Sequence, residues 1–143
     1  MNLEQETRYI LNKYNAHANK GYGQNFLIDQ NVVDGIIENA GVCKDDLIIE
    51  IGPGLGNLTS PLLENAGKVI CIELDPKMVS ILKDRFSLYK NFILNKLQPL
   101  SLFLNSILVG FSLSFNLLYS RYFFHTLGDG TPWQIISCVY NLG

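Results

Sequence analysis

Residues 49–56 read Ile-Glu-Ile-Gly-Pro-Gly-Leu-Gly and place a glycine-rich turn directly after a short β-branched run. The β-branched residues favour a strand, and the segment from Asn57 to Ala66 is expected to form a helix. Glycine allows positive φ and lets the backbone approach a ligand closely, while the helix start presents unpaired N–H groups. We therefore expect an anionic or nucleotide-like ligand at this turn.

A second apolar run, residues 68–72, ends at Glu73. An acidic residue about 20 residues after the first glycine is typical of the ribose-binding position of a Rossmann-like βαβ unit. A Walker-type phosphate loop would need a Lys-Ser/Thr pair after its glycines, and Asn57 and Leu58 stand there instead. The pattern therefore predicts a nucleotide-type ligand that is held without a Walker loop.

Glu50 lies within the first expected strand, where a carboxylate is unusual. It would suit a cationic ligand such as S-adenosylmethionine better than a pyrophosphate. Alternatively, the carboxylate is satisfied by N–H groups of the loop. Both interpretations stay open at this point.

The surrounding pattern alternates helices with strands. Asp29 or Asn31 can cap a helix that Gly41 ends, and Pro76 suits the first turn of another helix. The apolar residues of the first helix follow a helical period: Val32, Val33, Ile36 and Ile37. Those of the second form a stripe that we interpret as core: Met78, Val79, Ile81 and Leu82. The order helix, strand, helix, strand, helix predicts an α/β domain with a parallel sheet and helices on its faces.

Three motifs carry a family resemblance: GQNFLID at 23–29, IEIGPGLGNLT at 49–59 and IELD at 72–75. In order and spacing they resemble the N-terminal part of the ribosomal RNA adenine dimethyltransferases, over residues 20–91. The form GPGLGNLT looks more like the branch that dimethylates small-subunit RNA than the erythromycin-resistance branch. The resemblance implies an α/β, Rossmann-like, S-adenosylmethionine-dependent methyltransferase fold that is incomplete in this chain.

The resemblance also implies cofactor-binding roles for six residues: Asn25, Leu27, Gly52, Gly54, Gly56 and Glu73. The first two would line the methionine end of the cofactor pocket, and the first loop glycine would contact the cofactor. The other two glycines would shape the turn, and the glutamate would bind the ribose hydroxyls. From the residues alone, Asn25 and Phe26 would instead be interpreted as a capped turn with an aromatic side chain packed into the core.

The function implied is methyl transfer from S-adenosylmethionine to adenine N6 of small-subunit ribosomal RNA, by a cytoplasmic monomer that acts on the small ribosomal subunit without a metal ion. The three cysteines, Cys43, Cys71 and Cys138, have no metal-ligand spacing, and their odd number argues against a disulfide framework. No secretory signal is expected, because charged residues follow the first five residues.

A net charge of −2 gives no global electrostatic reason to bind RNA, so any RNA contact must be local. The best candidate is the N-terminal arm, residues 1–20, where basic residues alternate with aromatic ones in a pattern that continues to Tyr22: Arg8, Tyr9, Lys13, Tyr14, His17 and Lys20. The alternative is a solvated amphipathic helix, which we slightly favour. The cofactor-binding half-domain is then expected over residues 21–95.

The segment 96–143 departs from the family. Lys96 stands near the place of the family's acidic adenine contact, and the next charges are Arg121 and Asp129. The catalytic tetrapeptide N-(L/I)-P-(Y/F) has only a near miss, Asn116-Leu117-Leu118-Tyr119, which we interpret as a chance match, so no catalytic residue is assigned. The missing proline matters because it would fix the turn that aims the asparagine at the adenine amine.

Three interpretations of this tail compete. Residues 100–119 are uncharged and long enough for a membrane helix. A diverged second half of the sheet is another interpretation. We favour the third, a truncated or frame-shifted reading frame, with the membrane segment second. The alternative function is therefore an inactive nucleotide-binding fragment, membrane-associated through 100–119.

Overall fold

The computed structural model describes residues 1–19, 21, 24–96, 123–126 and 132–137. Its helices and strands follow in this order: α1 (Leu3–Lys13), α2 (Gln30–Ala40), β1 (Leu47–Ile51), α3 (Thr59–Asn65), β2 (Lys68–Glu73), α4 (Pro76–Arg85), β3 (Phe92–Lys96), β4 (Phe123–Thr126) and β5 (Pro132–Ser137).

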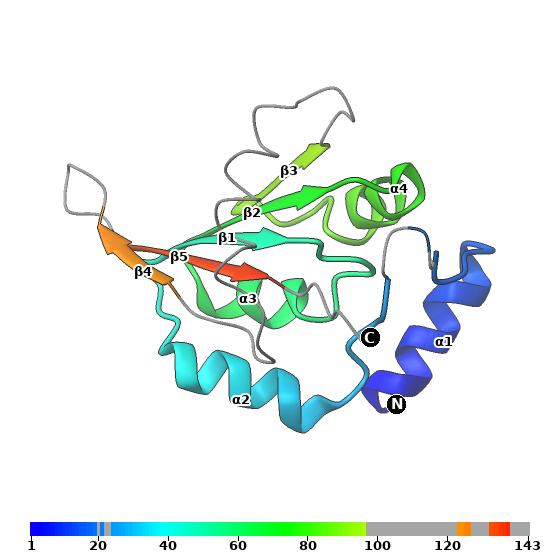
Figure 1. Cartoon of the computed structure of the whole chain (residues 1–143), viewed down its shortest axis with the longest axis horizontal. Coiled ribbons are helices and arrows are strands. Elements are labelled where there is room, and N and C mark those ends of the chain that lie inside the picture. Colours follow the sequence, from blue (N-terminus) through cyan, green and yellow to red (C-terminus); the bar gives the residue numbers. More distant parts are fainter. Residues whose placement is uncertain (20, 22–23, 97–122, 127–131, 138–143) are drawn as a thin grey trace.

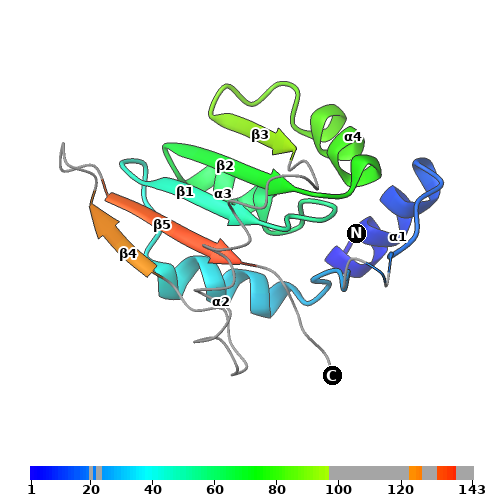
Figure 2. The same cartoon turned by 45° about the horizontal axis from the view of Figure 1, so that its top comes forward.

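The strands form one sheet in the order β3-β2-β1-β5-β4. Strands β3, β2, β1 and β5 run parallel, and β4 pairs antiparallel with β5. The predicted α/β fold with a parallel sheet is confirmed. Strands β1, β2 and β3 end at Ile51, Glu73 and Lys96, and we call this end of the sheet the carboxyl edge. Figures 1 and 2 show α1 beyond this edge.

The tail contributes two strands to this sheet. Strand β5 lies beside β1, in a register that pairs Ile51 with Ser137. The sheet therefore extends beyond the residues that carried the family resemblance. The expected membrane span 100–119 and the tetrapeptide at 116–119 lie outside the described residues. No helix in the described part of the chain is long and apolar enough to cross a membrane.

The helix boundaries follow local chemistry. The Asp29 carboxylate accepts a hydrogen bond from the Asn31 N–H at 2.9 Å and caps α2, which ends at Gly41 with φ +59°. Asp75 caps α4 in the same way, with Pro76 in its first turn. The helix expected from Asn57 begins two residues later, because the glycine loop first closes a turn of its own.

The core lies on one face of the sheet. Ile48 of β1 and Val69 and Cys71 of β2 pack in one cluster with side chains from α2, α3 and α4, among them Val33, Ile36, Leu62, Leu63 and Leu82. Residues of the opposite face, such as Ile49 and Ile70, are only half-buried and belong to neither described core cluster. Helices were predicted on the faces of the sheet. Among the described residues they cover one face only.

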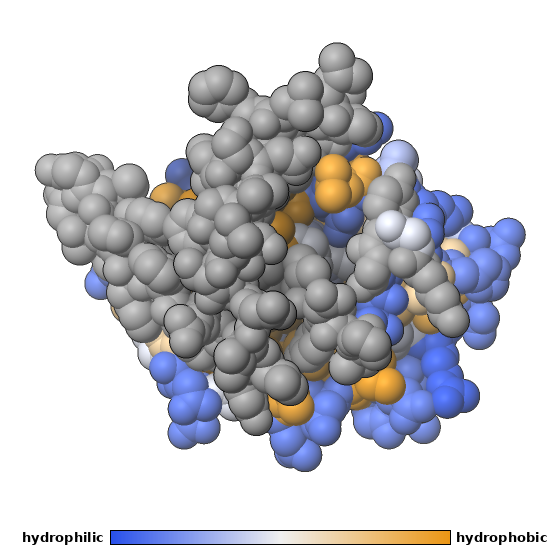
Figure 3. Space-filling model, viewed as in Figure 1, coloured by the Kyte–Doolittle hydropathy of each residue, from blue (hydrophilic) through white to orange (hydrophobic). Residues whose placement is uncertain are grey.

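A second cluster joins α1 to the carboxyl edge. Ile10 of α1 packs with Leu55 of the glycine loop and with Met78 and Ile81 of α4. Met78 is fully buried there, which confirms its prediction as a core residue. The outer surfaces of α1 and α2 are dominated by polar side chains (Figure 3).

Candidate functional site

The glycine loop at the carboxyl edge has three residues with left-handed backbone. Gly52, Gly54 and Gly56 have φ of +70°, +59° and +87°. This conformation is strained for residues with a side chain, and at two positions space is short as well. A Cβ on Gly56 would lie 2.5 Å from the Phe86 ring, and one on Gly54 would lie 3.3 Å from the Phe26 ring. The loop therefore favours glycine at all three positions and leaves no room for a Cβ at Gly56.

Glu73 ties this loop to the turn after β2. Its Oε2 accepts a hydrogen bond from the Gly54 N–H at 3.1 Å. Its Oε1 accepts from the N–H groups of Leu74 at 2.7 Å and Asp75 at 2.9 Å. The side chain is buried, with 5% of its residue surface exposed. A carboxylate at this place can also accept hydrogen bonds from ligand hydroxyl groups, because each oxygen has more than one lone pair.

The segment 24–27 crosses both turns. Gln24 Nε2 donates to the Asp75 carboxylate at 2.8 Å, after β2. Phe26 lies against Gly54 and packs on the second core cluster, as the packed aromatic was expected to do. The Leu27 carbonyl accepts from Asn57 Nδ2 at 2.7 Å, just after the loop. The structure therefore brings five of the six predicted cofactor residues to one edge of the sheet: Leu27, Gly52, Gly54, Gly56 and Glu73.

The sixth, Asn25, belongs to the same segment and is exposed. Its neighbours Gln24 and Phe26 are both anchored, so its backbone position over the carboxyl edge is fixed from either side. No side-chain hydrogen bond of Asn25 is found among the described residues.

Glu50 is completely buried on the face that α3 covers. Its Oε2 accepts a hydrogen bond from the Thr59 hydroxyl at 2.7 Å and one from the Cys71 thiol at 3.3 Å. The side chain thus points to the helix layer, where buried polar groups stabilise one another.

Helix α1 is amphipathic, as one alternative for the N-terminal arm predicted. Leu3, Thr7 and Ile10 are buried, whereas Arg8 forms an exposed ion pair with Glu4 at 2.7 Å. Lys13 lies 3.7 Å from Asp84. A hydrogen bond with the Tyr14 hydroxyl, followed by the charges of Tyr14 and Asp84, raises the pKa of Lys13. Both cations therefore already have partners within the chain.

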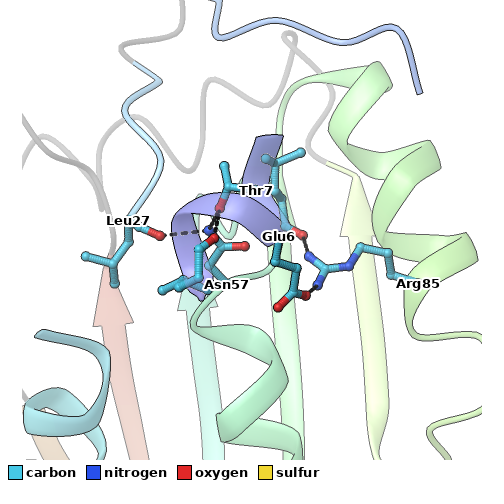
Figure 4. Close-up of polar contacts among 7 residues, drawn as sticks. Glu6, Thr7, Leu27, Asn57 and Arg85 are labelled. Atoms are coloured by element: carbon cyan, nitrogen blue, oxygen red, sulfur yellow. Dashed lines mark hydrogen bonds and ion pairs between the residues drawn. The ribbon is translucent and has the colours of Figure 1, made fainter. Parts of the chain in front are cut away.

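Two contacts that the sequence analysis missed bind α1 to the glycine loop (Figure 4). Asn57 Nδ2 donates to Thr7 Oγ1 at 2.7 Å. Arg85 of α4 pairs with Glu6 at 2.8 Å and donates to the Leu55 carbonyl. Burial lowers the pKa of Arg85, and the Glu6 carboxylate opposes this effect. No local pattern could have revealed these contacts, because their partners are 50 and 79 residues apart.

The remaining expectations concern metal ions and the place of the acidic residue that contacts the adenine in the family. Lys96 ends β3 and pairs in register with Glu73. Within the described ranges, no group of three or more His, Cys, Asp and Glu side chains could hold a metal ion. Cys43 is an exposed thiol and Cys71 a buried one, and Cys138 lies outside the described residues.

The family described as ribosomal RNA adenine dimethylase matches residues 15–102, more than half of the chain. The chain belongs to this family. The resemblance seen in the three motifs is thereby confirmed, and the matched residues include the glycine loop and Glu73 but not Glu6 or Thr7.

Among curated members of the adenine dimethylase family, the ribosomal RNA small subunit methyltransferase A of Clostridium acetobutylicum is 49% identical over 105 residues. These residues are 73% of this chain and 38% of that protein. The enzyme of the same name from Leuconostoc citreum is 49% identical over 85 residues, which are 59% of this chain and 29% of that protein. The chain thus spans well under half the length of these relatives.

A solved structure of similar fold is a dimethyladenosine transferase from Plasmodium falciparum. It is 28% identical, with a TM-score of 0.52, over 67% of this chain and 41% of that one. This likeness, together with the parallel sheet, confirms the predicted Rossmann-like methyltransferase fold and its incompleteness relative to such proteins.

Proposed function

We propose that the carboxyl edge binds S-adenosylmethionine, and that the reaction this fold serves is methyl transfer to adenine N6 of small-subunit ribosomal RNA. The observation that carries the proposal is the contact between Glu73 and the Gly54 N–H, which joins the left-handed glycine loop to the turn after β2. Parallel sheets bind nucleotide ligands at this edge. The names of the relatives supply the substrate class.

Each of the six residues has a role in this proposal. Glu73 accepts hydrogen bonds from the ribose hydroxyls, and Gly52 brings its backbone against the cofactor. Gly54 and Gly56 hold the loop in shape. Asn25 and Leu27, on the segment that crosses both turns, line the methionine end.

The chemistry needs orientation more than acid or base strength. The adenine amine attacks the methyl carbon in line with the C–S bond, whose electrons pass to sulfur, and N6 then loses a proton. Correct placement of the two reactants is the main contribution an enzyme makes to such a step. The adenine must also leave its stack to reach the methyl group. We propose a cytoplasmic monomer that uses no metal and acts on the small ribosomal subunit.

We further propose that this chain as written binds the cofactor but does not methylate RNA at a family-like rate. Lys96, and not an acidic residue, ends β3 beside Glu73. The tetrapeptide at 116–119 lacks its proline. A misplacement of about 1 Å in the target amine can reduce the rate on the order of a hundredfold.

The cofactor site is tested by calorimetry with S-adenosylhomocysteine. Wild type should bind, and Gly52→Val should abolish binding, because a side chain would stand where the backbone meets the ligand. Gly41→Val is the matched control. Gly41 also has a left-handed backbone, with φ of +59°, but it ends α2, and no atom of the described residues lies within 4 Å of an added Cβ. Equal binding by wild type and Gly52→Val would overturn the site assignment.

The activity is tested with under-methylated small subunits as substrate. The chain as written should transfer no more methyl groups than a blank, and a version with a family-like sequence after Asn91 should transfer them. Robust dimethylation by the 143-residue chain would overturn the proposed loss of activity. If the chain does not bind the cofactor, the alternative of an inactive fragment would replace the proposed function.

A further inference from the structure

The Asn57 side chain is the point where α1, the glycine loop and the segment 24–27 meet. Its Nδ2 donates to Thr7 Oγ1 and to the Leu27 carbonyl, both at 2.7 Å (Figure 4). Asn57 itself directly follows Gly56, the last glycine of the loop. One amide thus fixes three chain segments relative to one another.

The energetics indicate that this amide fixes position more than it adds stability. Asn57 is 6% exposed, and its Oδ1 has no hydrogen-bond partner among the described residues. A hydrogen bond adds little net stability, whereas a buried unpaired polar atom carries the full cost of its desolvation. The two bonds and the unpaired oxygen therefore offset one another to a large extent.

A second contact acts on the other side of Gly56. Arg85 donates to the carbonyl of Leu55, the residue before Gly56, and pairs with Glu6. Glu6 and Thr7 are neighbours on α1, so consecutive residues of this helix are joined to the loop on either side of Gly56. The position of α1 and the shape of the loop are thereby coupled.

We propose that Asn57 is a positioning residue of the cofactor site, and that α1 is part of that site through it. This inference rests on the proposed function, since Leu27 lines the methionine end there. Both hydrogen bonds that the Asn57 amide donates go to groups of the chain itself, so its role is to hold Leu27 in place relative to the loop. Loss of its amide should weaken cofactor binding beyond its effect on stability.

The chain offers a matched control at the other end of the sheet. Asn91 Nδ2 also donates to two backbone carbonyls, of Leu63 at 2.9 Å and Ala66 at 3.2 Å, where β3 begins. Asn57→Leu and Asn91→Leu remove the same amide at similar volume. We expect S-adenosylhomocysteine to bind Asn57→Leu about tenfold more weakly than wild type, a difference of about 1.4 kcal/mol. Asn91→Leu should bind S-adenosylhomocysteine with an affinity within about twofold of that of wild type, although its melting temperature should fall by as much as that of Asn57→Leu.

Thr7→Val tests the bond from Asn57 to Thr7 separately from the bond to Leu27. It also keeps the test valid if Asn57→Leu fails to fold. It removes the acceptor on α1 and leaves the bond between Asn57 and Leu27. We expect binding about threefold weaker. In wild type, hydrogen exchange of α1 amides should slow when S-adenosylhomocysteine binds, because coupling between the two sites is reciprocal. In Thr7→Val this slowing should be smaller.

The outcomes are distinguishable. If wild type binds and Asn57→Leu binds with the same affinity, this inference is overturned and the proposed function stays intact. Where Asn57→Leu does not fold, unchanged affinity in Thr7→Val has the same meaning. Equal weakening by Asn57→Leu and Asn91→Leu also overturns it, since stability alone would then explain the loss. No binding by wild type overturns the proposed function and, with it, this inference.

Discussion

The two ends of the same three strands close their turns in different ways. At the amino edge, where β1, β2 and β3 begin, the turn before β2 is closed by a backbone acceptor: the N–H groups of Gly67 and Lys68 both donate to the Asp46 carbonyl at 3.1 Å. At the carboxyl edge, the N–H groups of Gly54, Leu74 and Asp75 donate to one side chain, Glu73.

This difference separates turns that only stabilise from turns that can bind a ligand. A backbone carbonyl between two strands cannot move away without opening the sheet. A carboxylate at a strand end can accept further hydrogen bonds, because each oxygen has more than one lone pair. Both edges contain essential glycines, but for different reasons, and substitutions at them can break or sharpen the distinction.

Gly67→Ala should have the largest effect. A Cβ there would lie 2.2 Å from the Lys44 carbonyl oxygen, a backbone atom that cannot rotate away. We expect a loss of about 3 kcal/mol or more in the free energy of unfolding. Urea denaturation measures it. A loss of under about 1 kcal/mol would show that the amino edge is not rigid, contrary to the distinction drawn here.

Local patterns predicted much of the carboxyl edge. The β-branched runs predicted β1 and β2, and the candidate caps, Asp29 or Asn31 and then Gly41, predicted the ends of α2. The spacing from Gly52 predicted an acidic residue at the end of β2, where Glu73 lies. These features were predictable because each depends on residues close in sequence: a period, a cap or a turn.

Contacts between distant segments could not be predicted. The bonds from Asn57 to Thr7 and from Arg85 to Glu6 join polar side chains that, in sequence, look like any solvated surface. A second half of the sheet was one interpretation of the tail but not the favoured one, so the strands β4 and β5 were not expected. The low charge and scattered polar residues of the tail give no clear period that would predict a strand. Pairing with β1 supplies what the local pattern lacks.

Glu73→Gln should have the next largest effect, and it tests the carboxyl edge directly. The amide nitrogen cannot accept, so at least one of the three N–H donors loses its partner. We expect the free energy of unfolding to fall by about 1–3 kcal/mol and cofactor affinity to fall by a similar free energy. Thermal melts and calorimetry on one sample measure both. Lower stability with unchanged affinity would mean that Glu73 serves the fold alone.

Gly54→Ala should have a smaller effect. The left-handed backbone strains alanine by about 1–2 kcal/mol. The Phe26 ring, at 3.3 Å from the added Cβ, has to shift by only a few tenths of an ångström. Urea denaturation should show about this loss, and calorimetry should show weaker binding, because Phe26 belongs to the segment that crosses the loop. Unchanged binding would indicate that this segment moves independently of the loop.

Gly35→Ala should have the smallest effect, and of opposite sign. Gly35 lies in the middle of α2, at neither edge. Among the described residues, and apart from the helix's own backbone, a Cβ there would meet Asn39 Nδ2 alone within 4 Å, at 3.9 Å. Alanine restricts the unfolded chain and favours helix, so the free energy of unfolding should rise by about 0.5–1 kcal/mol. Cofactor affinity should not change, because α2 contributes no predicted contact to the carboxyl edge. If Gly35→Ala destabilised the protein as much as Gly54→Ala, glycine replacement would be harmful regardless of position, and the losses at the two edges could no longer be attributed to their geometry.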